Sequence, residues 1–439
     1  MSLKPLSQLL VSDRAAETPV SWRGEETLSF GRFRADVAAV AVRFADTPAA
    51  AIACRDSYRF AVGLFGLLSA GAHVVLPPSD RPAALAPLRG AFSALVDDAA
   101  VAAAGAADGT PIPVDAEKPA IDFFTSGSTG APKRIVKTLA MFEREAAMLE
   151  AAFGAGLDGT RVFATVPHQH MYGLPFKLLW PLSAGRPFCA ATHDFWEPLL
   201  AELAAGAVLV TSPAHLSRLA GIAPIEAARR PALVLSAGAP LPLAASNDAA
   251  AILGCRPTEI FGSTETGAMA TRRERRSEAD PWRLLPGVAV RADGEGRMAV
   301  RTAVLGPDWL ETADLIEPAP GGFVHRGRAD RIVKVEGKRV SLAAVEKELL
   351  RHPYVAEAAV VTLAGPLRIA AAVVTTETGN KALADMGKFR VGRRLRRAVA
   401  EAIDPAAAPR LWRFVTALPV RPMGKRRAGD IAALFGEAK

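Results

Sequence analysis

The sequence predicts an α/β protein. We expect a large N-terminal domain of mainly parallel sheets flanked by helices, with a β-rich subdomain, and a small α+β domain at the C-terminus. Short apolar runs alternate with alanine-rich helical segments through the first three quarters of the chain, turn-rich segments follow between residues 282 and 314, and the pattern changes again after residue 330. Strands that alternate with helices form parallel sheets covered on both faces. We therefore predict two domains, residues 1–329 and residues 330–439.

Six apolar runs are the expected strands of the large domain. They are rich in Val, Leu, Ile and Ala and lie near residues 50, 75, 95, 164, 210 and 235. The most apolar segment runs from Phe60 to Pro77, but three glycines and His73 interrupt it. It therefore predicts a buried helix followed by a strand, and we expect no stable membrane insertion.

The β-rich subdomain and the C-terminal domain have different patterns. Between Trp282 and Asp314, the run LPGVAVRADGEGRMAVRTAV predicts antiparallel hairpins, with Asp293-Gly294 at a turn. After residue 330 the expected elements are a helix over 341–353, strands over 356–363 and 368–376, a basic helix over 387–403 and a short strand over 411–419.

Composition and charge limit the classes of protein. The 439 residues, of which 50% are hydrophobic and 22% charged, exclude a disordered chain. The net charge of +8 has one source, because residues 331–439 contain 21 basic and 10 acidic residues (+11), whereas residues 1–330 contain 32 and 35 (−3). The run Arg393-Arg394-Leu395-Arg396-Arg397 raises the question of nucleic-acid binding, but no aromatic residue is interleaved in it. We therefore do not expect nucleic acid as a partner.

The cysteines and the N-terminus indicate a compartment. Cys54, Cys189 and Cys255 are odd in number and far apart, so they predict neither a disulfide framework nor a cysteine-based zinc site. Residues 1–17 have no sustained apolar core and no small-residue cleavage site, so they do not predict a secretory signal. A cytoplasmic protein is the expectation.

A loop rich in glycine and hydroxyl side chains follows the expected strand VDAEKPAIDFF and precedes an expected helix. Backbone N–H groups at glycines, hydroxyls and a lysine are suited to cradle a polyphosphate. The P-loop pattern requires Gly-Lys-Ser/Thr, but here Lys133 follows Pro132, so that pattern fails. A flexible linker is the other interpretation, although linkers seldom lie between an apolar strand and a helix. The expected phosphate ligands are Thr125, Ser126, Gly127, Ser128, Thr129, Gly130 and Lys133.

This loop resembles the phosphate loop of the adenylate-forming superfamily, which comprises acyl-CoA synthetases, luciferases and nonribosomal adenylation domains. Four more motifs of that superfamily follow in its order, over about 300 residues, and such an order does not arise by chance. The four are Phe261-Gly262-Ser263-Thr264-Glu265; Thr312-Ala313-Asp314; Gly327-Arg328-Ala329-Asp330 with Lys334, Gly337 and Lys338 to Val340; and Pro419 to Gly424-Lys425.

The resemblance implies ATP and Mg²⁺ as cofactors and assigns roles to the motif residues. Phe261 offers a face to adenine, Thr264 a hydroxyl to the α-phosphate and Glu265 a hard carboxylate ligand to Mg²⁺. Asp314 would accept from the ribose hydroxyls, and its Thr-Ala-Asp motif keeps the carboxylate of the family's Thr-Gly-Asp. Arg328 offers a guanidinium to ribose or phosphate. The remaining nucleotide ligands are expected to be Gly238, Ala239, Pro240, Gly262 and Ser263.

The resemblance also implies that the C-terminal domain moves. Asp330 would be the hinge about which the domain turns between two half-reactions. In one orientation Lys425 would reach the substrate carboxylate and the α-phosphate and stabilise the pentavalent transition state, although a lysine in a basic run is usually only solvated. In the other orientation the loop from Lys334 would face the site, and Gly337 would admit a pantetheine thiol. The expected catalytic residues are Lys425, Thr264 and His170.

The acyl pocket is expected near residues 166–174. His170 takes the position where the family has an aromatic residue or a histidine beside the acyl carboxylate; the alternative is a structural, hydrogen-bonded histidine. His168 and His170 could suggest a metal pair, but no third ligand is clustered with them. The Phe-Asp pair of amino-acid-activating domains is absent, which disfavours an α-amino acid. Small residues suit a flat ring or a narrow chain. The expected pocket residues are His170, Tyr172, Gly173, Ser236, Ala237, Gly238, Gly262, Gly267 and Ala268.

The resemblance thus implies a ligase that converts a carboxylic acid and ATP to acyl-AMP and pyrophosphate, and then transfers the acyl group to a thiol. The chain is short for the superfamily, and its run PHQHMYGLPFKLLWPL looks most like the ligases of bacterial aryl-polyene and xanthomonadin pigment clusters. That likeness suggests an aromatic acid such as a hydroxybenzoate, loaded onto an acyl carrier protein. The alternatives are free CoA as acceptor with an aromatic or fatty acid, an enzyme that stops at acyl-AMP and, from another class, a basic nucleic-acid-binding protein.

Overall fold

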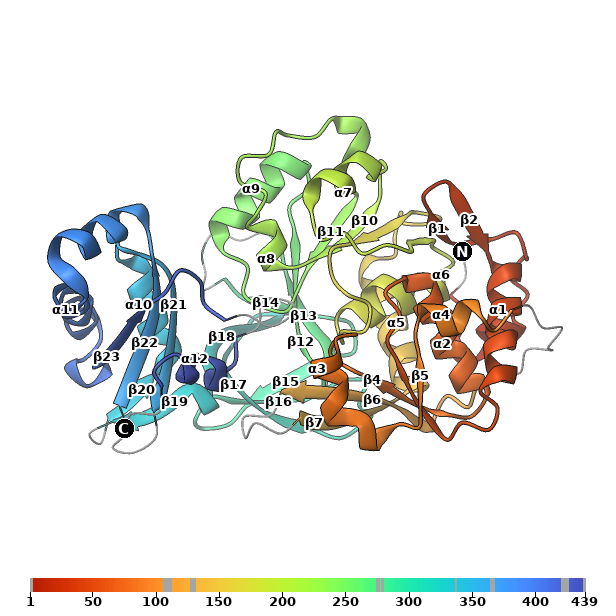
Figure 1. The fold of residues 1–439 in the computed structure, drawn as a ribbon, viewed down its shortest axis with the longest axis horizontal. Coiled ribbons are helices and arrows are strands. Elements are labelled where there is room, and N and C mark those ends of the chain that lie inside the picture. The colour runs from red at the N-terminus through yellow and green to blue at the C-terminus, as the bar shows by residue number, and fades with distance from the viewer. Residues whose placement is uncertain are drawn as a thin grey trace.

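The computed structural model describes residues 3–105, 113–126, 132–273, 277, 280–335, 338–363, 368–419 and 426–436. Four sheets and the helices that cover them form these parts (Figure 1). The predicted α/β class is confirmed. Within the described ranges, no helix is both long and apolar enough to cross a membrane.

The largest sheet contains 13 strands. They are β1 (Pro19–Arg23), β2 (Glu26–Ser29), β8 (Val162–Ala164), β9 (Phe188–Cys189), β10 (Val208–Thr211), β11 (Leu233–Ser236), β12 (Thr258–Ser263), β13 (Gly267–Arg272), β14 (Trp282–Leu284), β15 (Ala289–Ala292), β16 (Arg297–Arg301), β17 (Leu310–Ala319) and β18 (Gly322–Arg328). Their order is β15-β16-β17-β18-β14-β13-β12-β11-β10-β8-β9-β1-β2. The neighbours from β12 through β11, β10, β8 and β9 to β1 are parallel, whereas those from β12 to β15 are antiparallel. The expected β-rich segment is therefore the antiparallel half of this sheet, with the predicted hairpin at Asp293-Gly294.

A second sheet has five strands in the order β5-β3-β4-β6-β7. Its strands are β3 (Ala49–Ile52), β4 (His73–Leu76), β5 (Ala94–Val96), β6 (Pro119–Ser126) and β7 (Pro132–Thr138). The helix expected directly after the glycine-rich loop is wrong, because β7 returns antiparallel to β6 before α5 (Leu139–Phe153) begins. The side chains of β7 alternate with the period of a strand: Ile135 and Lys137 are buried and Arg134 and Val136 are exposed.

Helices fill the space between and outside the two sheets. They are α1 (Phe30–Arg43), α2 (Ser57–Ser69), α3 (Pro82–Leu85), α4 (Asp98–Ala102), α5, α6 (Trp180–Ala184), α7 (Trp196–Glu202), α8 (Pro213–Leu216) and α9 (Leu243–Leu253), with the shorter turns η1 (Leu6–Val11), η2 (Ala86–Ala91), η3 (Leu174–Leu179) and η4 (Ala227–Arg229). One core joins Val74 of β4, Leu149 of α5 and Val210 of β10, so α5 packs between the sheets. A second core packs α7 to α9 on the other face of β8, β10 and β11.

The described residues between 329 and 436 form a separate lobe, blue in Figure 1. After η5 (Ala329–Arg331) come β19 (Ile332–Val335), β20 (Lys338–Ser341), α10 (Leu342–Arg351), β21 (Val355–Leu363), β22 (Arg368–Thr375), α11 (Glu377–Ala402), η6 (Pro405–Ala407), β23 (Leu411–Phe414) and α12 (Ala428–Ala433). Two cores lie entirely within this lobe. Helix α11 begins ten residues before the expected helix and bends at Gly387, whose φ is +78°. The boundary between residues 329 and 330 stays a prediction.

Candidate active site

The turn between β12 and β13 presents Thr264 and Glu265. Ser263 pairs with Gly267 across the hairpin, and the Ser263 and Thr266 hydroxyls lie 3.0 Å apart beneath the turn. The backbone N–H of Ser263 also donates to the Thr266 hydroxyl at 3.1 Å. Both Thr264 and Glu265 are half-buried. These contacts between Ser263 and Thr266 fix the backbone of the turn that carries Thr264 and Glu265.

Two buried charged side chains hold this turn from behind. Lys137 of β7 donates from Nζ to the carbonyl oxygen of Glu265 at 2.5 Å, and Glu145 of α5 accepts from the backbone N–H of Ala268 at 2.8 Å. Burial lowers the pKa of Lys137 and raises the pKa of Glu145 to about 7, while each charge partly offsets the shift of the other. Sequence analysis missed both residues, because their importance arises from contacts between two sheets.

Gly267 leaves room for this arrangement. Its φ is +70°, and a Cβ atom there would lie 2.9 Å from Glu145 Oε1. Gly262 is equally constrained, since a Cβ would lie 2.4 Å from the carbonyl oxygen of Gly267. The hairpin therefore requires glycine at both positions for backbone reasons, and their predicted place in the pocket stays a prediction.

A polar and aromatic wall forms beside the turn, from β12, β17 and β18. The Phe261 ring contacts the ring of His325, with centroids 5.2 Å apart, and also packs against Trp282 and Phe323. His325 Nε2 lies 3.0 Å from Asp314 Oδ1. Asp314 is buried, so a carboxylate and an aromatic surface adjoin each other there. The sequence predicted Phe261 and Asp314, but not His325 between them.

Arg328 lies opposite Asp314 in the β17–β18 register and connects this wall to the lobe boundary. Its Nη1 is 3.6 Å from Asp314 Oδ2, and its Nε and Nη2 donate to Asp330 at 3.0 and 2.6 Å. The Asp330 hydrogen bond, with smaller contributions from Asp314 and Glu265, raises the pKa of Arg328. Three predicted carboxylates therefore lie close enough to Arg328 to raise its pKa: Glu265, Asp314 and Asp330.

The two histidines of the acyl segment differ. His168 is buried, with Nδ1 2.8 Å from the Ser57 hydroxyl and Nε2 2.9 Å from the carbonyl oxygen of Cys54. Because a carbonyl only accepts, Nε2 is the protonated nitrogen and Nδ1 the acceptor. Burial lowers the pKa of His168 to about 3, so it is neutral. With both nitrogens engaged, His168 has a structural role.

His170 is half-buried, and its Nδ1 accepts from the backbone N–H of Tyr172 at 3.3 Å. The neutral ring then has its proton on Nε2. Gly173 allows the turn to close, because a Cβ there would lie 2.0 Å from the carbonyl oxygen of Pro167. The segment 167–174 is thus a compact turn that continues from β8.

The carboxyl ends of β8, β10 and β11 meet at one edge of the large sheet, where this turn begins. The buried Tyr172 hydroxyl faces the backbone of Thr211 but forms no hydrogen bond within normal limits among the described residues. Thr211 pairs with Ser236, whose buried hydroxyl is also unpaired within the described part of the chain. Ala237 and Ala268 are buried nearby in the first core. The Ser236 side chain is on the other face of β11, with Val234, and Gly238 follows with φ +98°.

Several predicted residues lie outside the described ranges. They are Gly127, Ser128, Thr129, Gly130, Gly337 and Lys425. Thr125 pairs with Lys133 at the end of the β6–β7 hairpin, and Lys334 pairs with Arg339. Ala239 and Pro240 are exposed after β11. The roles of all of these residues stay predictions.

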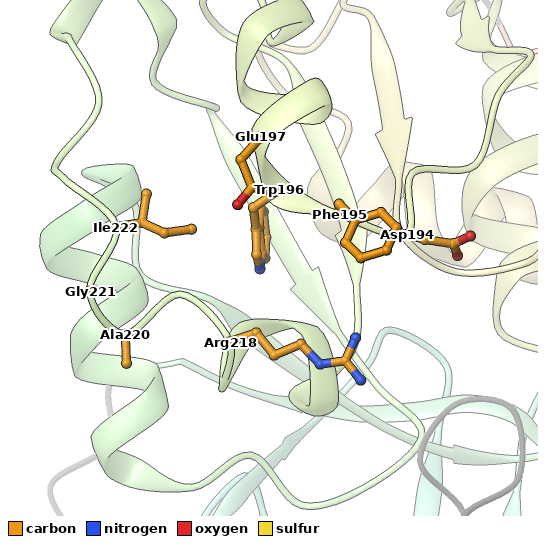
Figure 2. A pocket seen from close by; sticks show the side chains of 8 residues that line it. All are labelled: Asp194, Phe195, Trp196, Glu197, Arg218, Ala220, Gly221 and Ile222. Carbon is orange, nitrogen blue, oxygen red and sulfur yellow. The ribbon is translucent and has the colours of Figure 1, made fainter.

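A cavity of about 320 Å³ lies elsewhere, between the start of α7 and the segment after α8 (Figure 2). Residues 194–197, Arg218 and residues 220–222 line it, and none of the predicted site residues does. It is therefore distinct from the candidate active site.

The chain matches known proteins along most of its length. Residues 89–299 match the AMP-binding enzyme family, and residues 344–425 match the AMP-binding enzyme C-terminal domain. The 4-coumarate–CoA ligase of Cereibacter sphaeroides is 32% identical over 69% of each chain. A probable 2-succinylbenzoate–CoA ligase of Mycobacterium tuberculosis is 29% identical, over 72% of this chain and 84% of its own.

Solved structures share the fold. ATP-bound MatB from Rhodopseudomonas palustris has a TM-score of 0.79 at 19% identity, over 98% of this chain and 99% of its own. A benzoate CoA ligase from Burkholderia xenovorans has a TM-score of 0.75 at 21% identity, over 98% of this chain and all of its own.

The Lys137 contact can be tested directly. Lys137→Met leaves the carbonyl oxygen of Glu265 without its buried donor, which costs about 1–3 kcal/mol. We expect ATP–pyrophosphate exchange that depends on a carboxylic acid to fall by about fivefold to 150-fold in kcat/KM. Lys118→Met is the matched control, because Lys118 Nζ donates to the carbonyl oxygen of Gly71 at 2.8 Å on an exposed surface; it should stay within about twofold. A folded Lys137→Met variant with normal exchange would show that the turn does not depend on this contact.

Proposed function

Because this chain belongs to the AMP-binding enzyme family and is an ATP-dependent, carboxylic-acid-activating enzyme of it, we propose that it loads an aromatic acid onto the phosphopantetheine thiol of an acyl carrier protein. The observation that supports the nucleotide part is the convergence of Glu265, Asp314 and Arg328 at one wall beside Phe261. An aromatic face, a ribose-binding carboxylate and a guanidinium together suit a nucleotide.

The donor set also suits Mg²⁺. The Glu265 carboxylate is a hard oxygen ligand on a fixed turn, and Mg²⁺ binds through one or two carboxylates together with substrate phosphates. When bound, Mg²⁺ neutralises charge on the phosphates. We place Mg²⁺ at Glu265, with Thr264 directed to the α-phosphate.

The first half-reaction needs no protein nucleophile. The substrate carboxylate attacks the α-phosphorus, the α–β phosphoanhydride bond breaks, and pyrophosphate leaves. We assign Lys425 to the charge that develops on the α-phosphate and His170 to the position beside the acyl carboxylate. In the second half-reaction the thiol attacks the acyl carbon, the bond between that carbon and the AMP oxygen breaks, AMP leaves with the electron pair, and the thiol proton passes to water.

An aromatic acid fits the small residues around the acyl segment. Gly173 allows no side chain, Ala237 and Ala268 are small, and Tyr172 closes the edge with a buried hydroxyl. That hydroxyl is available to a polar substituent, which suits a hydroxybenzoate better than a fatty chain. The similar 4-coumarate–CoA ligase is named for an aromatic acid. We retain the likeness to the pigment-cluster ligases, and a cytoplasmic location, as parts of this proposal.

The exposed basic surface of the C-terminal lobe supports an acidic carrier protein as the acceptor of the acyl group. After the bend at Gly387, α11 buries Val391, Leu395 and Val399. Its opposite side exposes a basic patch, which we define as Lys388, Phe389, Arg390, Arg393 and Arg397. Phe389 is 77% exposed, and the Arg393 guanidinium lies 6.0 Å from its ring centroid. A solvent-exposed aromatic ring among cations suits a partner that is acidic and partly apolar.

Free CoA is the second candidate acceptor. It is favoured by the names of the curated relatives, which are CoA ligases or synthetases. CoA is also anionic, so charge alone does not distinguish it from a carrier protein.

A substrate panel tests the proposal. Pyrophosphate release with benzoates, cinnamates and fatty acids should be largest for a hydroxybenzoate, and thioester should form on carrier protein at least about tenfold faster than on CoA at equal concentration. Preference for a fatty acid would contradict the aromatic assignment, and efficient thioester formation on CoA would favour the second acceptor.

Single substitutions should impair one half-reaction and spare the other. Lys425→Ala should reduce pyrophosphate release by at least about a hundredfold and spare thioester formation from supplied acyl-AMP. Gly337→Leu should do the reverse, because a side chain there would obstruct the thiol. Equal loss in both half-reactions for Lys425→Ala would contradict a domain with two working orientations.

The basic patch makes a separate prediction. The double variant Arg390→Glu, Arg393→Glu should raise KM for carrier protein about tenfold or more, leave pyrophosphate release within about twofold, and reduce the salt dependence of transfer. The single variants Arg390→Glu and Arg351→Glu are also compared, because each changes the charge by two and Arg351 is exposed on α10 of the same lobe, where it pairs with Glu348. Equal effects of the two reversals would show that only net charge matters.

A further inference from the structure

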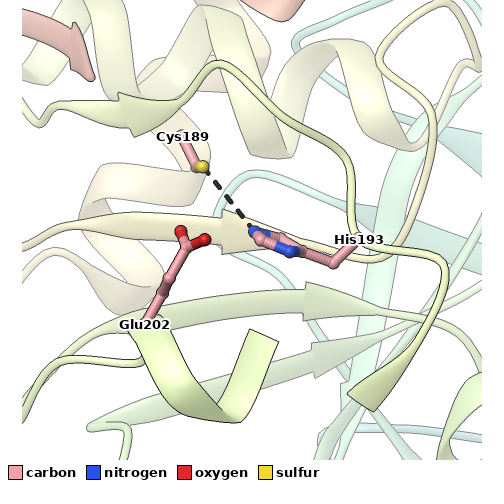
Figure 3. Close-up of side chains that lie close together, drawn as sticks. All are labelled: Cys189, His193 and Glu202. Carbon is pink, nitrogen blue, oxygen red and sulfur yellow. Dashed lines mark hydrogen bonds between the residues drawn. The ribbon is translucent and has the colours of Figure 1, made fainter. Parts of the chain in front are cut away.

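A cysteine, a histidine and a glutamate converge outside the candidate active site. Cys189 ends β9, His193 follows four residues later, and Glu202 ends α7. One ligand atom from each lies within 4.8 Å of the other two, and Cys189 Sγ is 3.7 Å from His193 Nε2. Figure 3 shows the Glu202 carboxylate directed toward the other two side chains.

The fold brings these groups together in one short segment. Strand β9 is parallel to β8, and the chain after it crosses the end of β8, where the backbone N–H of His193 donates to the carbonyl oxygen of Ala164 at 3.0 Å. Helix α7 then packs through Trp196 and Leu199 into the same core as Cys189. Cys189 and His193 are buried, whereas Glu202 is exposed.

The distances suit a tetrahedral ion. With metal–sulfur and metal–nitrogen bonds of about 2.3 and 2.05 Å, a separation of 3.7 Å between Sγ and Nε2 gives an angle of about 115° at the metal. Glu202 is exposed, and one of its carboxylate oxygens lies within 4.8 Å of both other ligand atoms. Sulfur, imidazole nitrogen and one carboxylate are ligands that zinc accepts, with water in the fourth position.

We propose that Cys189, His193 and Glu202 bind one Zn²⁺ ion that ties β9 to α7. A thiolate and a carboxylate would balance the two positive charges of the ion, so the occupied site would be neutral. The site contains none of the predicted nucleotide or acyl residues, so the ion would not take part in the proposed reaction. This inference does not depend on the proposed function.

Cobalt provides the test. The full chain, freed of any purification tag and of metal, should bind one equivalent of Co²⁺ with a thiolate-to-cobalt charge-transfer band, and Zn²⁺ should remove the band. Cys189→Ser should abolish the band. Cys54→Ser and Cys255→Ser are matched controls, because both thiols are buried and free, and they should keep it.

Glu202→Gln is the second variant, because Glu202 is exposed and its replacement leaves the buried core intact. It should weaken Zn²⁺ affinity at least about tenfold, with an unchanged circular dichroism spectrum. Zn²⁺ should raise the melting temperature of the parent chain and not that of Cys189→Ser. The proposal is overturned by the absence of a charge-transfer band, or by a band that Cys189→Ser retains.

Discussion

Two buried ionisable side chains, Lys137 and Glu145, connect β7 and α5 to the β12–β13 turn of the other sheet. Lys137 extends from the end of β7 and Glu145 from α5, yet both contact the β12–β13 turn more than 120 residues away. A buried charge without a partner is strongly destabilising. The two sheets are therefore connected by buried polar contacts beside the Glu265 turn, where we propose that the nucleotide binds. Lys133 is four residues before Lys137 on β7, so the strand that follows the glycine-rich loop also contacts the Glu265 turn.

Local patterns predicted a large part of this fold. The apolar runs near residues 50, 75, 164, 210 and 235 became β3, β4, β8, β10 and β11, because each is bounded by turn residues and buried on both faces. Strand β7 was missed because a lysine occupies one of its buried positions, which disguises the alternation. The first half of α11 was missed because Gly379 and Gly387 interrupt the helical pattern.

The residues of the candidate site also divide into those that the sequence predicts and those that it does not. Phe261, Glu265, Asp314 and Arg328 could be predicted because each belongs to a short motif. His325 could not, since its contact with Asp314 depends on the β17–β18 register, and no motif contains it. The spacing along the sequence does not match a common zinc-binding pattern for Cys189, His193 and Glu202. Only the packing of α7 shows that they meet.

The ion pair between Arg328 and Asp330 has a consequence for the lobe boundary. Three N–H groups of one guanidinium are directed at two carboxylates, so a ligand that engages this arginine competes with Asp330 for the same donors. Both partners are about half exposed, and such a pair contributes little stability, on the order of 1 kcal/mol or less. If Arg328 binds the nucleotide as proposed, the ligand can replace this weak ion pair without a large barrier. By thermodynamic reciprocity, a movement at residue 330 that releases Arg328 would then also strengthen the binding of that ligand.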